Sequence, residues 1–232
     1  MDVIWQGLIK AFYMLKSGDP EIWRITWLTL RVSATATLLG LLIGVPLGTL
    51  LALTRFPGRR LAVSIVNTSM GLPPVVVGLW VTIFLWRSGP LGQFNLIYTP
   101  TAIIIAQAII ASPIIIGLTS AAIQQIDPKM RLQIKALGAT RVQYVWYLLK
   151  EARFSLLAAV IAGFGAVISE VGASMMVGGN IKGETRVLTT ATVMEVSKGN
   201  FDVAIALSVL LALLSYVITL GLTLMQQKRQ EG

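Results

Sequence analysis

The stretch QQIDPKMRLQIKALGATRVQYVWYLLKEAR, residues 124–153, separates two long apolar runs and is punctuated like a pair of short helices. Asp127 can cap the first helix with its carboxylate, and Pro128 has the fixed φ that a first helical turn accepts. Gly138 can end that helix in the left-handed conformation. Thr140, followed by a glutamine three residues later, fits a capping box for the second helix. The stretch therefore predicts a helix, a glycine turn and a second helix.

The first of these short helices is predicted to be amphipathic. Met130, Ile134 and Leu137 would give it an apolar face. The basic residues around that face are Lys129, Arg131, Lys135 and Arg141. An exposed apolar face is stabilised when another surface packs against it, and two kinds of surface fit this one. The first is a protein partner, and the second is the chain's own helical bundle or anionic lipid headgroups.

Long apolar runs lie on both sides of this loop. Of the 232 residues, 55% are hydrophobic and 12% are charged, whereas soluble domains carry about 25% charged residues. A helix needs roughly 20 apolar residues to cross the hydrocarbon core of a bilayer. The stretches that satisfy this are 28–53, 61–86, 101–123, 154–177 and 204–224. The sequence predicts an all-α integral membrane protein, with residues 1–232 forming one domain of about five transmembrane helices.

Small residues and prolines mark the predicted spans. Gly40, Gly44 and Gly48 recur every four residues, so they line one helical face. Close packing of another backbone is the favoured interpretation, because van der Waals contact drives helix association in lipid. Lining of a pore is the alternative. Pro73 and Pro74 interrupt the second span, and such breaks need neighbouring groups or water to satisfy the freed carbonyls.

The loops differ in charge. Residues 54–60, 124–153 and the tail after residue 224 hold eleven Lys and Arg against three Asp and Glu. The positive-inside rule places this set in the cytoplasm. With five spans, the N-terminus is then expected outside and the C-terminus in the cytoplasm. The net charge of +9 therefore reflects membrane orientation rather than nucleic-acid binding.

Several kinds of chemistry are excluded by composition. The chain has no cysteine and no histidine, so thiol nucleophiles, imidazole bases and the usual transition-metal ligands are absent, and no metal site is expected. It also has no Gly-x-x-x-x-Gly-Lys-Ser/Thr loop for nucleotide phosphates. No paired acid and base appears in the spans, which argues against a membrane enzyme.

The segment KALGAT, residues 135–140, resembles the glycine-centred cytoplasmic loop of ATP-binding-cassette (ABC) importer permeases, often called the EAA loop. It lies about twenty residues before a span, as in that family. The positions where the family favours Glu-Ala-Ala read Leu132, Gln133 and Ile134 here, and the later Leu-Pro reads Lys150 and Glu151. The glycine and its neighbours match, and the triplet that gives the loop its name does not.

Further matches extend the resemblance across nearly the whole chain. GLPPVVVG at 71–78 looks like the corresponding stretch of molybdate, tungstate and sulfate permeases. SEVGAS at 169–174 and NIKGETR at 180–186 are similar to the Glu-x-Gly-Ala and Asn-Ile-Pro-Gly-x-Thr elements of oxyanion permeases, with Lys182 in place of the usual proline. The variant EVGASMMVGGN, with RVLTT after it, looks most like the tungstate-specific branch.

This resemblance implies a type I ABC importer permease fold in a bacterial or archaeal cell membrane, with the loop 124–153 as its coupling loop. Two copies of the chain would line one pathway. Each would dock a cytoplasmic ATPase that carries ATP and Mg²⁺, so this chain needs no cofactor and is not itself an enzyme. An external oxyanion-binding protein would deliver the substrate. The residues implied in ATPase coupling are Asp127, Met130, Ile134, Lys135, Ala136, Gly138, Ala139 and Arg141.

Candidate residues for the pathway or gate come from the same sequence matches and from the energetic cost of placing a charge inside the membrane. Glu170 is the only acidic residue well inside a span, where a charge costs roughly 2.5 to 3.5 kcal/mol near the centre. A carboxylate repels an oxyanion, so hydrogen bonding that fixes helix geometry is expected of it. Neutral donors can guide an anion without trapping it. The full candidate set is Pro73, Pro74, Ser169, Glu170, Ser174 and Asn180. Lys182 and Arg186 either attract the anion or a binding protein, or belong to a solvated loop.

Two other functions are also compatible with parts of the sequence. A molybdate or general oxyanion permease such as a sulfate permease is the nearest alternative to tungstate. A secondary transporter is the alternative from another class, but proton coupling typically uses several intramembrane carboxylates or histidines. One glutamate and no histidine argue against it.

Overall fold

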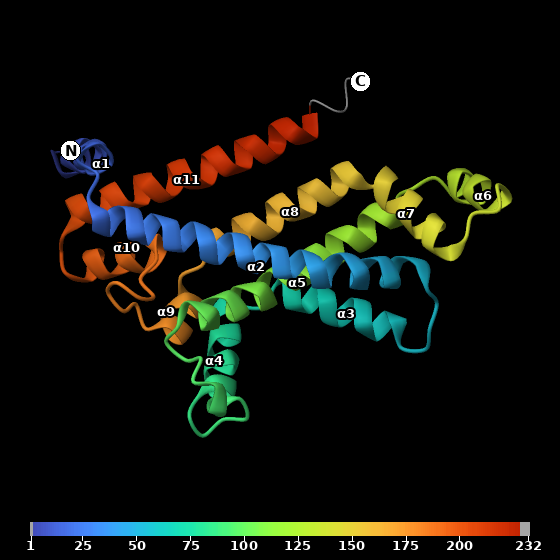
Figure 1. The fold of residues 1–232 in the computed structure, drawn as a ribbon, viewed down its shortest axis with the longest axis horizontal. Coiled ribbons are helices and arrows are strands. Elements are labelled where there is room, and N and C mark those ends of the chain that lie inside the picture. The colour runs from blue at the N-terminus through green and yellow to red at the C-terminus, as the bar shows by residue number, and fades with distance from the viewer. Residues whose placement is uncertain (1, 228–232) are drawn as a thin grey trace.

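The computed structural model describes residues 2–227, and every regular element within that range is a helix (Figure 1). The prediction of an all-helical fold is confirmed. The elements are α1 (Asp2–Ser17), α2 (Pro20–Leu53), α3 (Arg59–Met70), α4 (Pro74–Leu85), η1 (Gly92–Phe94), α5 (Pro100–Gln124), α6 (Pro128–Ala136), α7 (Arg141–Glu151), α8 (Arg153–Ile168), α9 (Gly172–Gly178), α10 (Leu188–Ser197) and α11 (Phe201–Gln227).

Three helices, α2, α5 and α11, are each long and apolar enough to cross a bilayer unbroken. The count rises to five if each of two bent helix pairs is one span, by length and composition. One bent pair is α3 with α4, which meet at 103°, so the predicted stretch 61–86 is not a single helix. The other pair is α7 with α8, which meet at 68°. The predicted stretch 154–177 is likewise broken, because α8 ends at Ile168 and α9 begins at Gly172.

The bend between α3 and α4 has a local cause. Proline has no backbone N–H, and the residue before a proline is disfavoured in the α conformation. Pro73 precedes Pro74, has ψ 127° and caps α4 from outside, while Pro74 takes the first helical position. The chain therefore leaves α3 at Gly71 and starts again in another direction. In Figure 1, α4 projects from the body of the molecule.

Close packing of α2 against α5 forms the centre of the molecule, where the two helices run side by side (Figure 1). Gly40, Gly44 and Gly48 are buried in α2 and face α5. A Cβ atom built on Gly44 would lie 2.6 Å from Cγ2 of Ile115, and one on Gly48 would lie 2.6 Å from the Ile116 carbonyl oxygen. The packing interpretation of these glycines is therefore confirmed over pore lining.

We expect Gly48→Ala to destabilise the protein by about 1–3 kcal/mol, the usual cost of an overpacked contact. The added methyl group would press on backbone, which cannot swing aside as a long side chain can. The measurement is the thermal unfolding midpoint of the purified protein in detergent.

Gly165→Ala is the matched control for this prediction. Gly165 also lies inside a helix, but a Cβ there would meet nothing within 4 Å. Alanine is the better helix former by roughly 0.5–1 kcal/mol, so the control should be neutral or stabilising. An unchanged midpoint in Gly48→Ala would contradict the tight α2–α5 contact.

Candidate functional site

The turn between α6 and α7 has the predicted local structure. Asp127 caps α6 through Oδ1, which accepts a hydrogen bond from the Lys129 N–H at 2.8 Å. Gly138 follows the end of α6 with φ 78°. Its N–H donates to the Lys135 carbonyl at 3.0 Å, and the Ala139 N–H donates to the Ile134 carbonyl at 3.4 Å. This pair of bonds is a Schellman motif, in which glycine avoids the steric cost of positive φ.

The start of α7 carries the predicted capping box. The Gln143 N–H donates to Thr140 Oγ1 at 3.3 Å, and the Thr140 N–H donates to Gln143 Oε1 at 2.9 Å. The two caps and the glycine turn fix α6 relative to α7. The helix, turn, helix prediction for this loop is confirmed.

The apolar side chains of this loop divide between inside and outside. Ile134 is buried, and half-buried Met130 packs with it against Ile123 and Leu148 of the neighbouring helices. Leu137, by contrast, is 87% exposed. The predicted apolar face is therefore split, because Met130 and Ile134 contact the chain's own core and only Leu137 of that set faces out.

Two further apolar side chains of this loop, which we did not single out from the sequence, are also exposed. Leu132 on α6 is 66% exposed and Val142 on α7 is 81% exposed. We call Leu132, Leu137 and Val142 the exposed loop patch. Of the other predicted coupling residues, Ala136 and Arg141 are exposed and Ala139 is half-buried. The Lys135 ammonium lies 5.1 Å from the centre of the Tyr144 ring.

Glu170 is held at the start of α9. Glu170 is only 7% exposed, and its Oε1 accepts a hydrogen bond from the Ala173 N–H at 2.7 Å. The Glu170 carbonyl oxygen accepts from Thr189 Oγ1 at 3.0 Å. The carboxylate thus satisfies an otherwise unbonded helix N–H, and Thr189 ties the same residue to α10. The expected hydrogen bond is present, and the role of Glu170 in fixing helix geometry stays a prediction.

Ser174 lies inside α9 and meets a residue that sequence reasoning missed. The Gln107 amide of α5 donates from Nε2 to Ser174 Oγ at 3.2 Å, and both residues are buried. Gln107 Oε1 is buried and has no hydrogen-bond partner among the described residues. Gln107 is the only amide side chain between residues 101 and 123, and an amide alone in an apolar span could have identified it as a candidate.

The remaining candidates lie around the same short helix. Asn180 follows the end of α9 with φ 51°, and its side-chain Oδ1 is buried without a hydrogen-bond partner among the described residues. Ser169 is exposed, and its hydroxyl donates to the Gly165 carbonyl at 2.8 Å. Pro73 and Pro74 begin α4, which packs against α9. The structure therefore brings the candidates together around α9, with Ser169 on the exposed side.

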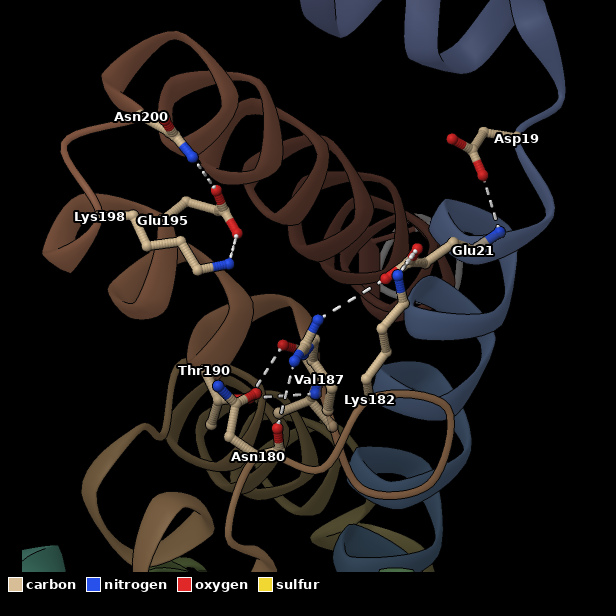
Figure 2. A network of polar contacts seen from close by, with 10 residues as sticks. Asp19, Glu21, Asn180, Lys182, Val187, Thr190, Glu195, Lys198 and Asn200 are labelled. Atoms are coloured by element: carbon tan, nitrogen blue, oxygen red, sulfur yellow. Dashed lines mark hydrogen bonds and ion pairs between the residues drawn. The ribbon is translucent and has the colours of Figure 1, made fainter.

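Charged residues gather where the start of α2 meets the loop after α9 (Figure 2). Glu21 pairs with Lys182 at 2.7 Å and with Arg186 at 3.6 Å. The adjoining cavity has a volume of about 450 Å³ and is also lined by Arg24 and Arg31. Lys182 and Arg186 are thus held by an acid, and the cavity beside them keeps an excess of positive charge.

A second charged cluster lies on the same side of the molecule, at the end of α10 (Figure 2). The Asn200 amide and the Lys198 ammonium contact the Glu195 carboxylate at 2.8 and 2.9 Å. These contacts, the Asn200 hydrogen bond first, hold the pKa of the Glu195 carboxyl below its ordinary value. Glu195 therefore stays ionised at neutral pH and ties α10 to the loop before α11.

Three comparisons relate the chain to known proteins. The family model described as "Binding-protein-dependent transport system inner membrane component" matches residues 44–230. The tungstate uptake system permease protein of Peptoclostridium acidaminophilum is 39% identical over 98% of this chain and 100% of that protein. The protein of the same name from Campylobacter jejuni is 38% identical over 94% and 91%. A solved inward-facing methionine ABC transporter matches with a TM-score of 0.75 and 26% identity over 90% of this chain and 98% of that one.

For Glu170 we expect a difference between two substitutions. Glu170→Ala leaves the Ala173 N–H unbonded and should lower the free energy of unfolding by about 1–3 kcal/mol. Glu170→Gln keeps a side-chain carbonyl that can accept the same bond, so its loss should be clearly smaller. Thermal unfolding of the two purified variants measures the difference. If glutamine is as damaging as alanine, the charge matters and the hydrogen-bonding role is wrong.

Proposed function

The chain belongs to the family of binding-protein-dependent transport system inner membrane components, and from that membership we propose that it forms the membrane pathway of an ATP-driven tungstate importer. Its fold is that of the type I ABC importer permeases. The assignment of tungstate as substrate rests on the 39% identity, over essentially the full length of both chains, to a permease named for tungstate uptake. The sequence elements around α9 that resemble the tungstate-specific branch support the same substrate.

In the proposed pathway, α9 positions the groups that meet the anion. Tungstate is a dianion, and neutral hydrogen-bond donors can hold it without the tight binding that a set of cations would give. Ser174, Gln107 and Asn180 carry neutral polar groups around α9. Because Ser174 and Gln107 are buried in this structure, α9 would have to move for them to meet the anion, and Glu170 fixes the start of that helix. Pro73 and Pro74 set the direction of α4 against the same helix. Ser169, at the break between α8 and α9, completes the proposed gate.

The proposed entry point is the charged region beside α2. Arg24, Arg31, Lys182 and Arg186 line or adjoin one cavity there, against Glu21 and Glu184. An excess of positive charge in a recess raises the local concentration of an anion and speeds its arrival. Glu21 weakens that field, so the region attracts tungstate without trapping it. We place this region, with the N-terminus, on the outer side of the membrane, and the C-terminus in the cytoplasm.

The conformational change driven by ATP would be transmitted to the pathway through α6. ATP and Mg²⁺ would bind a separate ATPase that docks on the exposed loop patch of Leu132, Leu137 and Val142. Because Ile134 and Met130 pack against Ile123 and Leu148, a push on α6 would move the ends of α5 and α7 with it. Nucleotide drives such a change only if it favours one conformation over the other.

The complete transporter in this proposal contains two copies of the chain, two ATPases and an external oxyanion-binding protein, all in or on a lipid bilayer. The chain itself then performs no hydrolysis. The absence of a phosphate-binding loop in the sequence supports that division. A permease that shares the pathway between two copies also accounts for the apolar surface that α4 leaves exposed in one chain, including Leu79 and Trp80.

We expect Leu137→Glu to abolish copurification of the ATPase and ATP-dependent uptake. The substitution puts a charge at the most exposed apolar position of the loop, and desolvating it on docking would be costly. Gln133→Glu, an exposed polar position on the same helix, is the matched control and should keep both properties. Retained association in Leu137→Glu would overturn the docking site and leave the permease assignment standing.

The substrate is tested by metal content. Cells with and without this gene are grown with equal trace amounts of tungstate and molybdate and with ample sulfate, and their tungsten and molybdenum are measured. We expect tungsten alone to fall in cells lacking the gene. A fall in both metals would indicate a broader oxyanion importer, and no change in either would overturn the substrate class.

A further inference from the structure

A cavity of about 530 Å³ lies at the opposite end of the molecule from the charged region beside α2. It is lined by the ends of α2 and α5, the start of α3, the α6 helix and Tyr144 of α7, and it adjoins the exposed loop patch through Leu132. Four cationic residues line it and no acidic residue does; the cations are Arg55, Arg59, Arg131 and Lys135. We call this the arginine cavity. Figure 1 shows the elements around it meeting at the right of the view.

Two of the arginines are fixed in place by helix ends. Arg59 Nε donates to the Leu51 carbonyl oxygen at 2.8 Å, in the last turn of α2. Arg131 Nη2 donates to the Ile123 carbonyl oxygen, in the last turn of α5. Carbonyls at a helix C-terminus carry partial negative charge, so both bonds are favourable. Each guanidinium is therefore oriented without being neutralised by an acid.

The guanidinium groups retain unused donors. A guanidinium has five N–H groups, and Arg59 and Arg131 each use one in these backbone bonds. Arg131 Nε is buried and has no hydrogen-bond partner within residues 2–227. An unbonded donor is costly, so the Arg131 guanidinium gains from an acceptor that reaches it.

The charge around the cavity is also unpaired. The four ion pairs found within the described part of the chain are Lys10–Asp202, Lys182–Glu21, Arg186–Glu21 and Lys198–Glu195. None of these four pairs involves a residue that lines the arginine cavity. In the cavity, Lys135 contacts the Tyr144 ring, which does not cancel its charge. Like charges held together repel each other, and a bound anion removes that repulsion.

We infer that the arginine cavity binds a tetrahedral oxyanion of the phosphate class. Guanidinium forks match the oxygens of such a group, and two forks held by backbone bonds meet it with little loss of side-chain entropy. The phosphate of an anionic lipid headgroup and free inorganic phosphate share this chemistry. Because Arg59 belongs to α3 and Arg131 to α6, the bound anion fastens α6 to the α2–α3 turn. Its binding is independent of which substrate the chain carries.

The test measures thermal unfolding of the delipidated full-length chain in a neutral detergent. One arm adds inorganic phosphate against chloride at equal ionic strength. The other adds short-chain phosphatidylglycerol against short-chain phosphatidylcholine. A ligand that binds only the folded state raises the midpoint, and we expect a rise of at least about 2 °C in one arm or both. The arm that responds identifies the source of the phosphate group.

Substitutions tie the effect to the cavity. Arg55→Gln and Arg131→Gln should each remove at least half of the rise. Arg55 lines the cavity, is exposed and makes none of the described backbone bonds, so its loss leaves the fold intact if Arg131→Gln does not fold. The matched controls are Arg60→Gln and Lys129→Gln, which remove exposed cations next to the cavity that do not line it.

Three results would overturn the inference. The first is no rise with inorganic phosphate and none with phosphatidylglycerol, the two probes that carry a net negative charge. The second is a rise of equal size in Arg55→Gln and in the controls, since that would be a general charge effect. The third is stabilisation by the purified ATPase alone that Arg55→Gln abolishes, because the cavity would then receive an acidic side chain of the partner.

Discussion

The close contact between α2 and α5 is the constraint on which the other features depend. In lipid, apolar surfaces gain little by leaving the solvent, so two helices stay together through short-range packing. Gly40, Gly44 and Gly48 remove the side chains that would hold the backbones apart. The position of α5 then sets the rest: Gln107 meets α9 near one end, and the Ile123 carbonyl meets Arg131 at the other. The proposed pathway around α9 and the proposed coupling helix α6 are therefore both attached to α5.

How well the sequence predicted each feature follows from the range of the interactions involved. Asp127, Gly138 and Thr140 act on backbone groups within five residues, so their residue types alone predicted the caps and the turn. The contact between Gln107 and Ser174 joins residues 67 positions apart, and no local pattern encodes it. Pro73 and Pro74 predicted a break in the second span but not its 103° angle. Prolines show where a helix can break, but neighbouring helices decide the direction in which it resumes.

The split of the loop's apolar residues shows the same limit. Ile134 and Leu137 fit one helical face by spacing, yet one is buried and the other is 87% exposed. Leu137 lies past the end of α6, where the chain turns toward the left-handed Gly138, so helical periodicity no longer describes its direction. The turn that the sequence predicted correctly is thus the cause of the orientation that periodicity predicted wrongly.

Cations are paired with an acid at one end of the molecule and lack an acidic partner at the other. This difference bears on how a transporter of anions can work. Near α9 the cations Lys182 and Arg186 are paired with Glu21, which lowers the affinity for an anion. Release from that end would then be fast, as transport requires. No acid lines the arginine cavity, so the proposed anion would be held more firmly there and would act as part of the structure. Arg59 belongs to α3 and Arg131 to α6, so the proposed anion would join these two elements, and α6 is the element on which the proposed ATPase acts. A tightly held anion at this position stiffens the connection, so that force applied to α6 reaches α2 and α5 together rather than bending the loop.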